Sequence, residues 1–202
     1  MIKKLLTLLT IVTAGAVLAI NTNAQNRTGA GNMNSRLFSL VQAAREGRAK
    51  LNPEIAQQVR EDFAETDTKD TASFSPSIVG TWNCVIATSD TGLPPFKALQ
   101  TFSSDGTFVE TSDLLGMGGE GPAHGVYERG RRGYILTFEL FVFDPMTGES
   151  VGRVRVRGSI RMMSSNDFHA VTAVDFIELD GTVIEDIDGG PFDGSRLQVR
   201  SV

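Results

Sequence analysis

The chain has 202 residues, with 24 acidic and 19 basic side chains and a formal net charge of −5. This negative charge argues against binding to a nucleic-acid backbone, because such binding depends on clustered Lys and Arg. The single cysteine, Cys84, excludes an intramolecular disulfide, so the stability of the fold must come from its core.

Residues 1–24 are typical of a signal peptide. Lys3 and Lys4 form a basic start, Leu5 to Ile20 form an apolar core, and Thr22-Asn23-Ala24 supplies small residues for cleavage. The apolar core is shorter than the roughly 18 to 20 residues that a membrane span needs. We therefore expect a secreted or periplasmic protein with no membrane span, whose mature chain carries a formal charge of about −7 once the two lysines are removed.

Intact-mass measurement of exported protein is expected to show the loss of about 24 residues, because the basic, apolar and small segments occur in the order that signal cleavage requires. Recovery of the full-length chain from the cytosol would contradict export.

Residues 25–77 are predicted to form an appendage before the main domain. The stretch from Gln25 to Met33 lacks periodicity and is expected to be disordered. Apolar residues recur at helical spacing from Ser35 to Lys50, and Asn52-Pro53 supplies an N-cap and a first-turn proline for a second helix ending near Glu65. The two apolar stripes face either the following domain or another subunit, which leaves a homo-oligomer through these helices open. The polar stretch from Thr66 to Ser77 is expected to be a linker.

From residue 78 to residue 202, short alternating segments between turn signals predict β-strands. Phe96, Ala98, Gln100 and Phe102 share one face of the second strand, and Asp105-Gly106 predicts the hairpin that follows it. Arginines at every second position mark a solvent face on the strand from Ser150 to Met162: Arg153, Arg155, Arg157 and Arg161. The predicted fold class is all-β, an antiparallel meander of eight or nine strands closed into a barrel and preceded by two short helices.

Gly80-Thr81-Trp82, at the start of the first strand, resembles the Gly-x-Trp signature of lipocalins and the wider calycin group. Three further segments are similar to uncharacterised bacterial secreted proteins of lipocalin-like type: Pro94 to Phe102, Ser104 to Phe108 and His124 to Arg129. The resemblance implies a barrel for a small apolar ligand, with the tryptophan closing the barrel floor against Arg196 or Arg200 of the last strand. An allene-oxide-cyclase-like or dirigent-like barrel is the competing fold, and a fold alone does not define a function.

The candidates for a ligand site in the barrel lumen are aromatic residues, one histidine and one carboxyl residue: Trp82, Phe102, Phe108, His124, Tyr127, Phe138 and Glu139. His124 has small neighbours, which let a ligand or another backbone approach closely. In a dry lumen Glu139 would have a raised pKa, as a general acid or base near neutral pH requires. On the outer face it would instead pair with the arginines of the next strand, and the pattern favours this position. Other carboxyl groups that interrupt apolar strands are Glu110, Glu128 and Asp175.

No cofactor or metal is predicted, because His124 and His169 stand in no metal-binding spacing. The stretch from Asp186 to Gly194 is rich in oxygen ligands and glycine, but it lacks the calcium-loop pattern and is expected to be a wide turn between two strands. Hydrolase and dinucleotide motifs are absent. Three functions stay open, and a binding module for a small hydrophobic molecule is favoured. The alternatives are a cofactor-free cyclase or isomerase and a structural or self-associating envelope protein.

Overall fold

The structure is a computed structural model that describes residues 30–64, 76–86, 95–113 and 122–199, with side chains described from residue 38 onward. The predicted signal peptide and most of the predicted linker lie outside the described residues. The helices are α1 (Ala30–Arg45) and α2 (Pro53–Ala64). The strands are β1 (Gly80–Ile86), β2 (Phe96–Phe102), β3 (Thr107–Ser112), β4 (Ala123–Gly130), β5 (Gly133–Phe143), β6 (Ser150–Met162), β7 (Asp167–Glu178) and β8 (Val183–Arg196).

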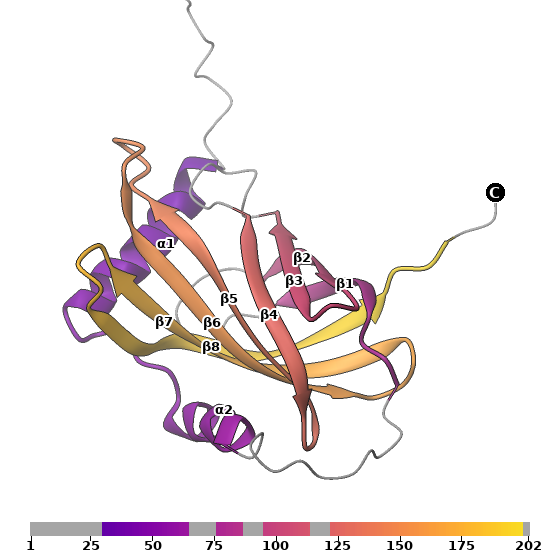
Figure 1. Ribbon diagram of the computed structural model, residues 1–202. Helices are drawn as coiled ribbons and strands as arrows, with labels where there is room; N and C mark the ends of the chain where they lie inside the picture. Colours follow the sequence, from indigo (N-terminus) through magenta and orange to yellow (C-terminus); the bar gives the residue numbers. More distant parts are fainter. Residues whose placement is uncertain (1–29, 65–75, 87–94, 114–121, 200–202) are drawn as a thin grey trace, which may run out of the picture.

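The eight strands form one closed antiparallel barrel (Figure 1). Each strand pairs with the next in sequence, and β1 also pairs with β8 to close the barrel. The predicted fold class is therefore confirmed. Below, the floor is the end of the barrel where β1 begins and β8 ends, and the mouth is the opposite end, where β1 ends and β2 begins.

Alternation along the strands separates the interior from the outer face. In β3, Phe108, Glu110 and Ser112 are buried and the residues between them are exposed. The predicted hairpin between β2 and β3 is confirmed, because Phe102 pairs with Phe108 and the Oδ1 of Asp105 accepts a hydrogen bond from the Thr107 amide at 3.0 Å. Gly106 has a φ of 88°, a left-handed conformation that glycine adopts at little cost.

The C-terminal part of the barrel differs from the prediction. The stretch from Asp186 to Gly194 lies within the single strand β8 and is not a turn between two strands. Its glycines allow close packing, because a Cβ at Gly189 would collide with the Thr172 carbonyl and a Cβ at Gly194 would collide with the Phe168 ring. The oxygen-rich stretch is therefore spread along an extended strand and does not form a calcium loop.

Helix α2 packs on the outer face of β7. Its N-cap is confirmed, since the Oδ1 of Asn52 accepts a hydrogen bond from the Glu54 amide at 2.9 Å. Val59 is fully buried and belongs to a cluster with Val171 and Ala173 of β7. The apolar stripe of this helix thus faces the barrel.

Helix α1 lies at the mouth, beside β6 to β8 (Figure 1). It begins at Ala30, so it includes part of the stretch that was expected to be disordered. Leu40, Val41 and Ala44 are buried in the same apolar cluster as the barrel interior. At its C-terminal end, the Nε of Arg45 donates a hydrogen bond to Glu178 at 2.7 Å. None of the described helices has the length and apolar character that a membrane span requires.

Candidate functional site

The floor half of the barrel interior is filled by aromatic rings. The Trp82 ring lies 4.9 Å from that of Phe168, and the Phe108 ring lies 5.0 Å from those of Phe102 and Phe138. Tyr127 adds a ring 5.2 Å from Phe102. Five of the seven candidates are therefore brought together inside the barrel: Trp82, Phe102, Phe108, Tyr127 and Phe138.

Trp82 closes the floor together with Arg196. The indole Nε1 donates a hydrogen bond to the Ile78 carbonyl at 2.8 Å, and the Arg196 guanidinium lies 4.2 Å from the tryptophan ring centroid. Arg196 also donates to three backbone carbonyls at 2.6 to 2.8 Å, those of Ser77, Val79 and Ser165. The predicted contact between tryptophan and arginine is confirmed for Arg196, and Arg200 lies outside the described residues.

A buried polar pair lies next to the aromatic rings on the side of the mouth. Gln100 is one inward position beyond Phe102, Glu110 is one inward position beyond Phe108, and the two residues pair across β2 and β3. The Nε2 of Gln100 donates a hydrogen bond to Glu110 at 2.6 Å. The residues are only 1% and 8% exposed, and the Oε1 of Gln100 has no hydrogen-bond partner in the described part of the chain. Because an unpaired buried acceptor costs free energy, this oxygen is suited to accept a hydrogen bond from a bound molecule.

Burial controls the protonation of the interior groups. It raises the pKa of Glu110 to about 7, although the hydrogen bond from Gln100 acts in the opposite direction. Cys84 is one inward position beyond Trp82, and burial, with a further contribution from the charge of Glu110, raises the pKa of its thiol. The thiol is therefore neutral and a poor nucleophile, whereas Glu110 can either donate or accept a proton near neutral pH.

Small side chains flank the polar pair on β4 and on the side of the mouth. Ala123 pairs with Glu110, and Ala98 and Ser112 hold the next inward positions of β2 and β3. Larger apolar side chains, including Leu140 and Val154, line the interior on β5 and β6. The pair is thus a polar group next to apolar side chains in the barrel interior, and small-molecule sites combine the two kinds of group.

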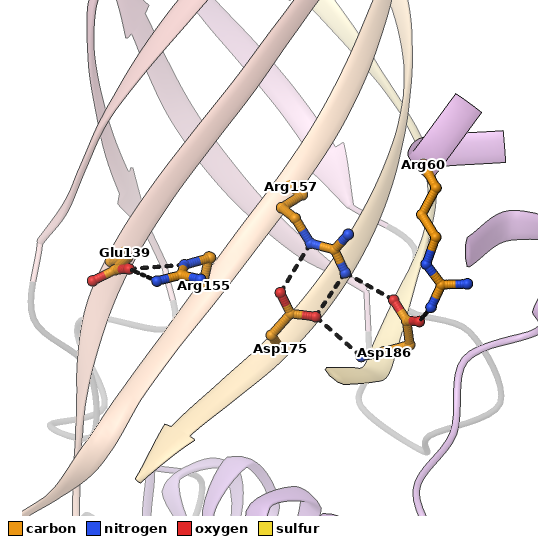
Figure 2. A network of polar contacts seen from close by, with 6 residues as sticks. All are labelled: Arg60, Glu139, Arg155, Arg157, Asp175 and Asp186. Carbon is orange, nitrogen blue, oxygen red and sulfur yellow. Dashed lines mark hydrogen bonds and ion pairs between the residues drawn. The ribbon is translucent and has the colours of Figure 1, made fainter. Parts of the chain in front are cut away.

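Glu139 lies on the outer face, so its inclusion among the lumen residues is wrong. It accepts hydrogen bonds from Arg153 at 2.6 Å and from Arg155 at 2.9 Å, and Figure 2 shows its pairing with Arg155. The favoured alternative, pairing with the arginines of the next strand, is confirmed. The interior carboxyl group in this part of the barrel is instead that of Glu110.

His124 is also exposed on the outer face, where it lies opposite Glu139 in register. The adjacent strand β5 occupies the space beside its small neighbour Gly125, because a Cβ on Gly125 would collide with Phe138 and with the Thr137 carbonyl. His124 is therefore not part of the lumen.

A second polar cluster fastens α2 to the outer face of the barrel (Figure 2). Arg157 donates hydrogen bonds to Asp175 at 2.8 and 2.9 Å and to Asp186 at 2.9 Å. Arg60 of α2 pairs with Asp186 as well. The positive charges of two arginines and the negative charges of two aspartates cancel here. The cluster therefore needs no further partner, and its role is structural.

Among the described residues, no group of three His, Cys, Asp or Glu side chains is placed to hold a metal ion. Comparison with known protein families gives no match, and comparison with curated proteins gives none either. The structural class of the protein therefore follows from its fold and interior. It is a closed eight-stranded antiparallel barrel with a tryptophan and an arginine at its floor and a buried Gln100–Glu110 pair.

Proposed function

We propose that the protein is an exported binding module that holds a small, mainly apolar molecule inside the barrel, with the polar end of that molecule at Gln100 and Glu110. The observation that carries the proposal is the Oε1 of Gln100, a buried acceptor without a described partner, beside the buried carboxyl group of Glu110. The predicted signal peptide supports export, and the Gly-x-Trp resemblance together with the Trp82–Arg196 contact supports a lipocalin-like barrel.

The polar pair favours a ligand with a neutral hydroxyl group. A hydroxyl group donates to the Oε1 of Gln100 and also accepts from Glu110 when that residue is protonated. A ligand carboxylate would meet repulsion from Glu110 in its ionised form. Long-chain or cyclic apolar alcohols are therefore the preferred ligand class.

Binding is tested by titrating the mature protein with a fatty alcohol, the matched fatty acid and the matched alkane, followed by tryptophan fluorescence and thermal unfolding. The alcohol is expected to bind saturably and to raise the melting temperature by mass action. Gln100→Leu is expected to weaken alcohol binding by about tenfold, since one hydrogen bond contributes about 1 kcal/mol or slightly more. It should leave alkane binding unchanged.

Glu139→Gln is the matched control, because this carboxyl group lies on the outer face. It is expected to bind the alcohol like the unmodified protein. The absence of saturable binding by all three compounds, or equal weakening by both substitutions, would overturn the proposal.

The second candidate function is a cofactor-free cyclase or isomerase, favoured by the pKa of Glu110 at about 7. A group with this pKa is suited to general acid–base catalysis at neutral pH. Conversion of a bound unsaturated molecule that is lost in Glu110→Gln, while binding persists, would place the protein in this class.

A further inference from the structure

A groove of about 430 Å³ lies on the outer surface, between α2, the β4–β5 hairpin and β6 to β8. It is distinct from the barrel interior. The charged and titratable side chains that line it are those of Asp62, Arg131, Arg132, Arg161, His169 and Asp193.

Strand register explains how the centre of the groove is built. Arg161 pairs with His169 across β6 and β7, and His169 pairs with Asp193 across β7 and β8. The three side chains therefore stand side by side on the outer face. At the edge of this row Gly133 has no side chain, and a Cβ there would collide with the Ile160 carbonyl. Arg161 itself is exposed and lines the groove.

The carboxyl groups of the groove already have partners. Asp193 contacts the Nδ1 of His169 at 2.8 Å, and because a carboxylate only accepts, this nitrogen carries the proton. Asp62 lies 3.9 Å from Arg132. Both aspartates that line the groove are therefore occupied by partners, whereas Arg161 also lines it.

Arg161 differs from the other arginines in the outer row of β6. Arg153 and Arg155 bind Glu139, and Arg157 binds two aspartates. Within the described residues, Arg161 makes no hydrogen bond or ion pair with a carboxylate. It is also the member of the row that lines the groove.

We propose that this groove, whose lining also includes Arg131 and Arg132, binds the oxyanion of a small molecule, a carboxylate or a phosphate, with Arg161 as the ligand. The planar guanidinium presents paired donors that fit both groups. Because the groove is partly open to solvent, added salt should weaken the interaction.

The test is calorimetric titration of the mature protein with inorganic phosphate and, separately, with succinate at low ionic strength. Saturable binding of at least one anion is expected, and the stronger of the two distinguishes a phosphate site from a carboxylate site. Arg161→Gln is expected to weaken that binding by about tenfold, as loss of a charge-assisted hydrogen bond predicts.

Arg153→Gln is the matched control, since Arg153 lies on the same strand and face but outside the groove. It should bind the anion like the unmodified protein, and Arg161→Gln should keep any binding of fatty alcohol. Failure of both anions to bind saturably, or equal loss in Arg153→Gln and Arg161→Gln, would overturn this proposal without bearing on the barrel interior.

Discussion

Trp82→Ala is expected to lower the free energy of unfolding by about 3 to 5 kcal/mol, the range for deleting a large buried ring. The side chain is fully buried, packs against Phe168 at 4.9 Å and lies under Arg196 at 4.2 Å. Its loss leaves a cavity at the floor and removes the hydrogen bond to the Ile78 carbonyl. Urea unfolding followed by circular dichroism measures the change, because the variant has no tryptophan for fluorescence.

Phe141→Ala provides the control for Trp82→Ala. This ring is 54% exposed on β5, so its removal is expected to change the free energy of unfolding by no more than about 0.5 kcal/mol. Trp82→Phe keeps a ring but lacks the indole N–H, and it should give an intermediate loss. Equal stabilities for Trp82→Ala and Phe141→Ala would show that the floor is not closed by packed side chains.

The unmodified protein is expected to become less stable as pH rises from about 4.5 to about 7, because of Glu110. Glu110→Gln is expected to abolish this pH dependence. Burial raises the pKa of Glu110 from its ordinary value of about 4.5 to about 7, so in this window the folded state holds a proton that the unfolded state releases. Stability from this group is therefore fully present below pH 4.5 and falls as pH rises. The shift corresponds to about 3 kcal/mol.

Urea unfolding at pH 5 and pH 8 measures this effect in both proteins. At pH 8 the variant should be the more stable of the two, because glutamine has no charge to bury. Taking the difference between the proteins cancels the contributions of the other carboxyl groups. An unchanged pH dependence in Glu110→Gln would count against a buried acidic group.

Local patterns predicted the strands, but they did not predict that Gln100 and Glu110 form a buried pair. Alternation put Gln100 on the same face as Phe102, and Glu110 was recognised as a carboxyl group interrupting an apolar strand. The sequence did not distinguish Glu110 from Glu139, because β5 carries apolar residues on both faces, including the exposed Phe141. Pairing with β6 decides between them, since it places Arg153 and Arg155 beside Glu139.

The glycines of β8 show a second limit of local reasoning. A run of glycine and aspartate is typical of turns, and nothing adjacent in sequence reveals that Gly189 and Gly194 must accommodate Thr172 and Phe168 of β7. The charged cluster of Arg157, Asp175 and Asp186 was missed for a related reason. A register shift between β7 and β8 brings these groups together, and such a shift has no local sequence signal.

The contact between Trp82 and Arg196 joins the first strand to the last, so it forms only when nearly the whole barrel sequence is present. All other strand pairs join neighbours in the chain and close shorter loops. Pairing of β1 with β8 closes the longest loop, so it has the largest entropic cost of closure. We therefore expect this pairing to form late in folding. Because the chain has one tryptophan, at this junction, its emission in a refolding experiment reports barrel closure separately from the earlier formation of hairpins.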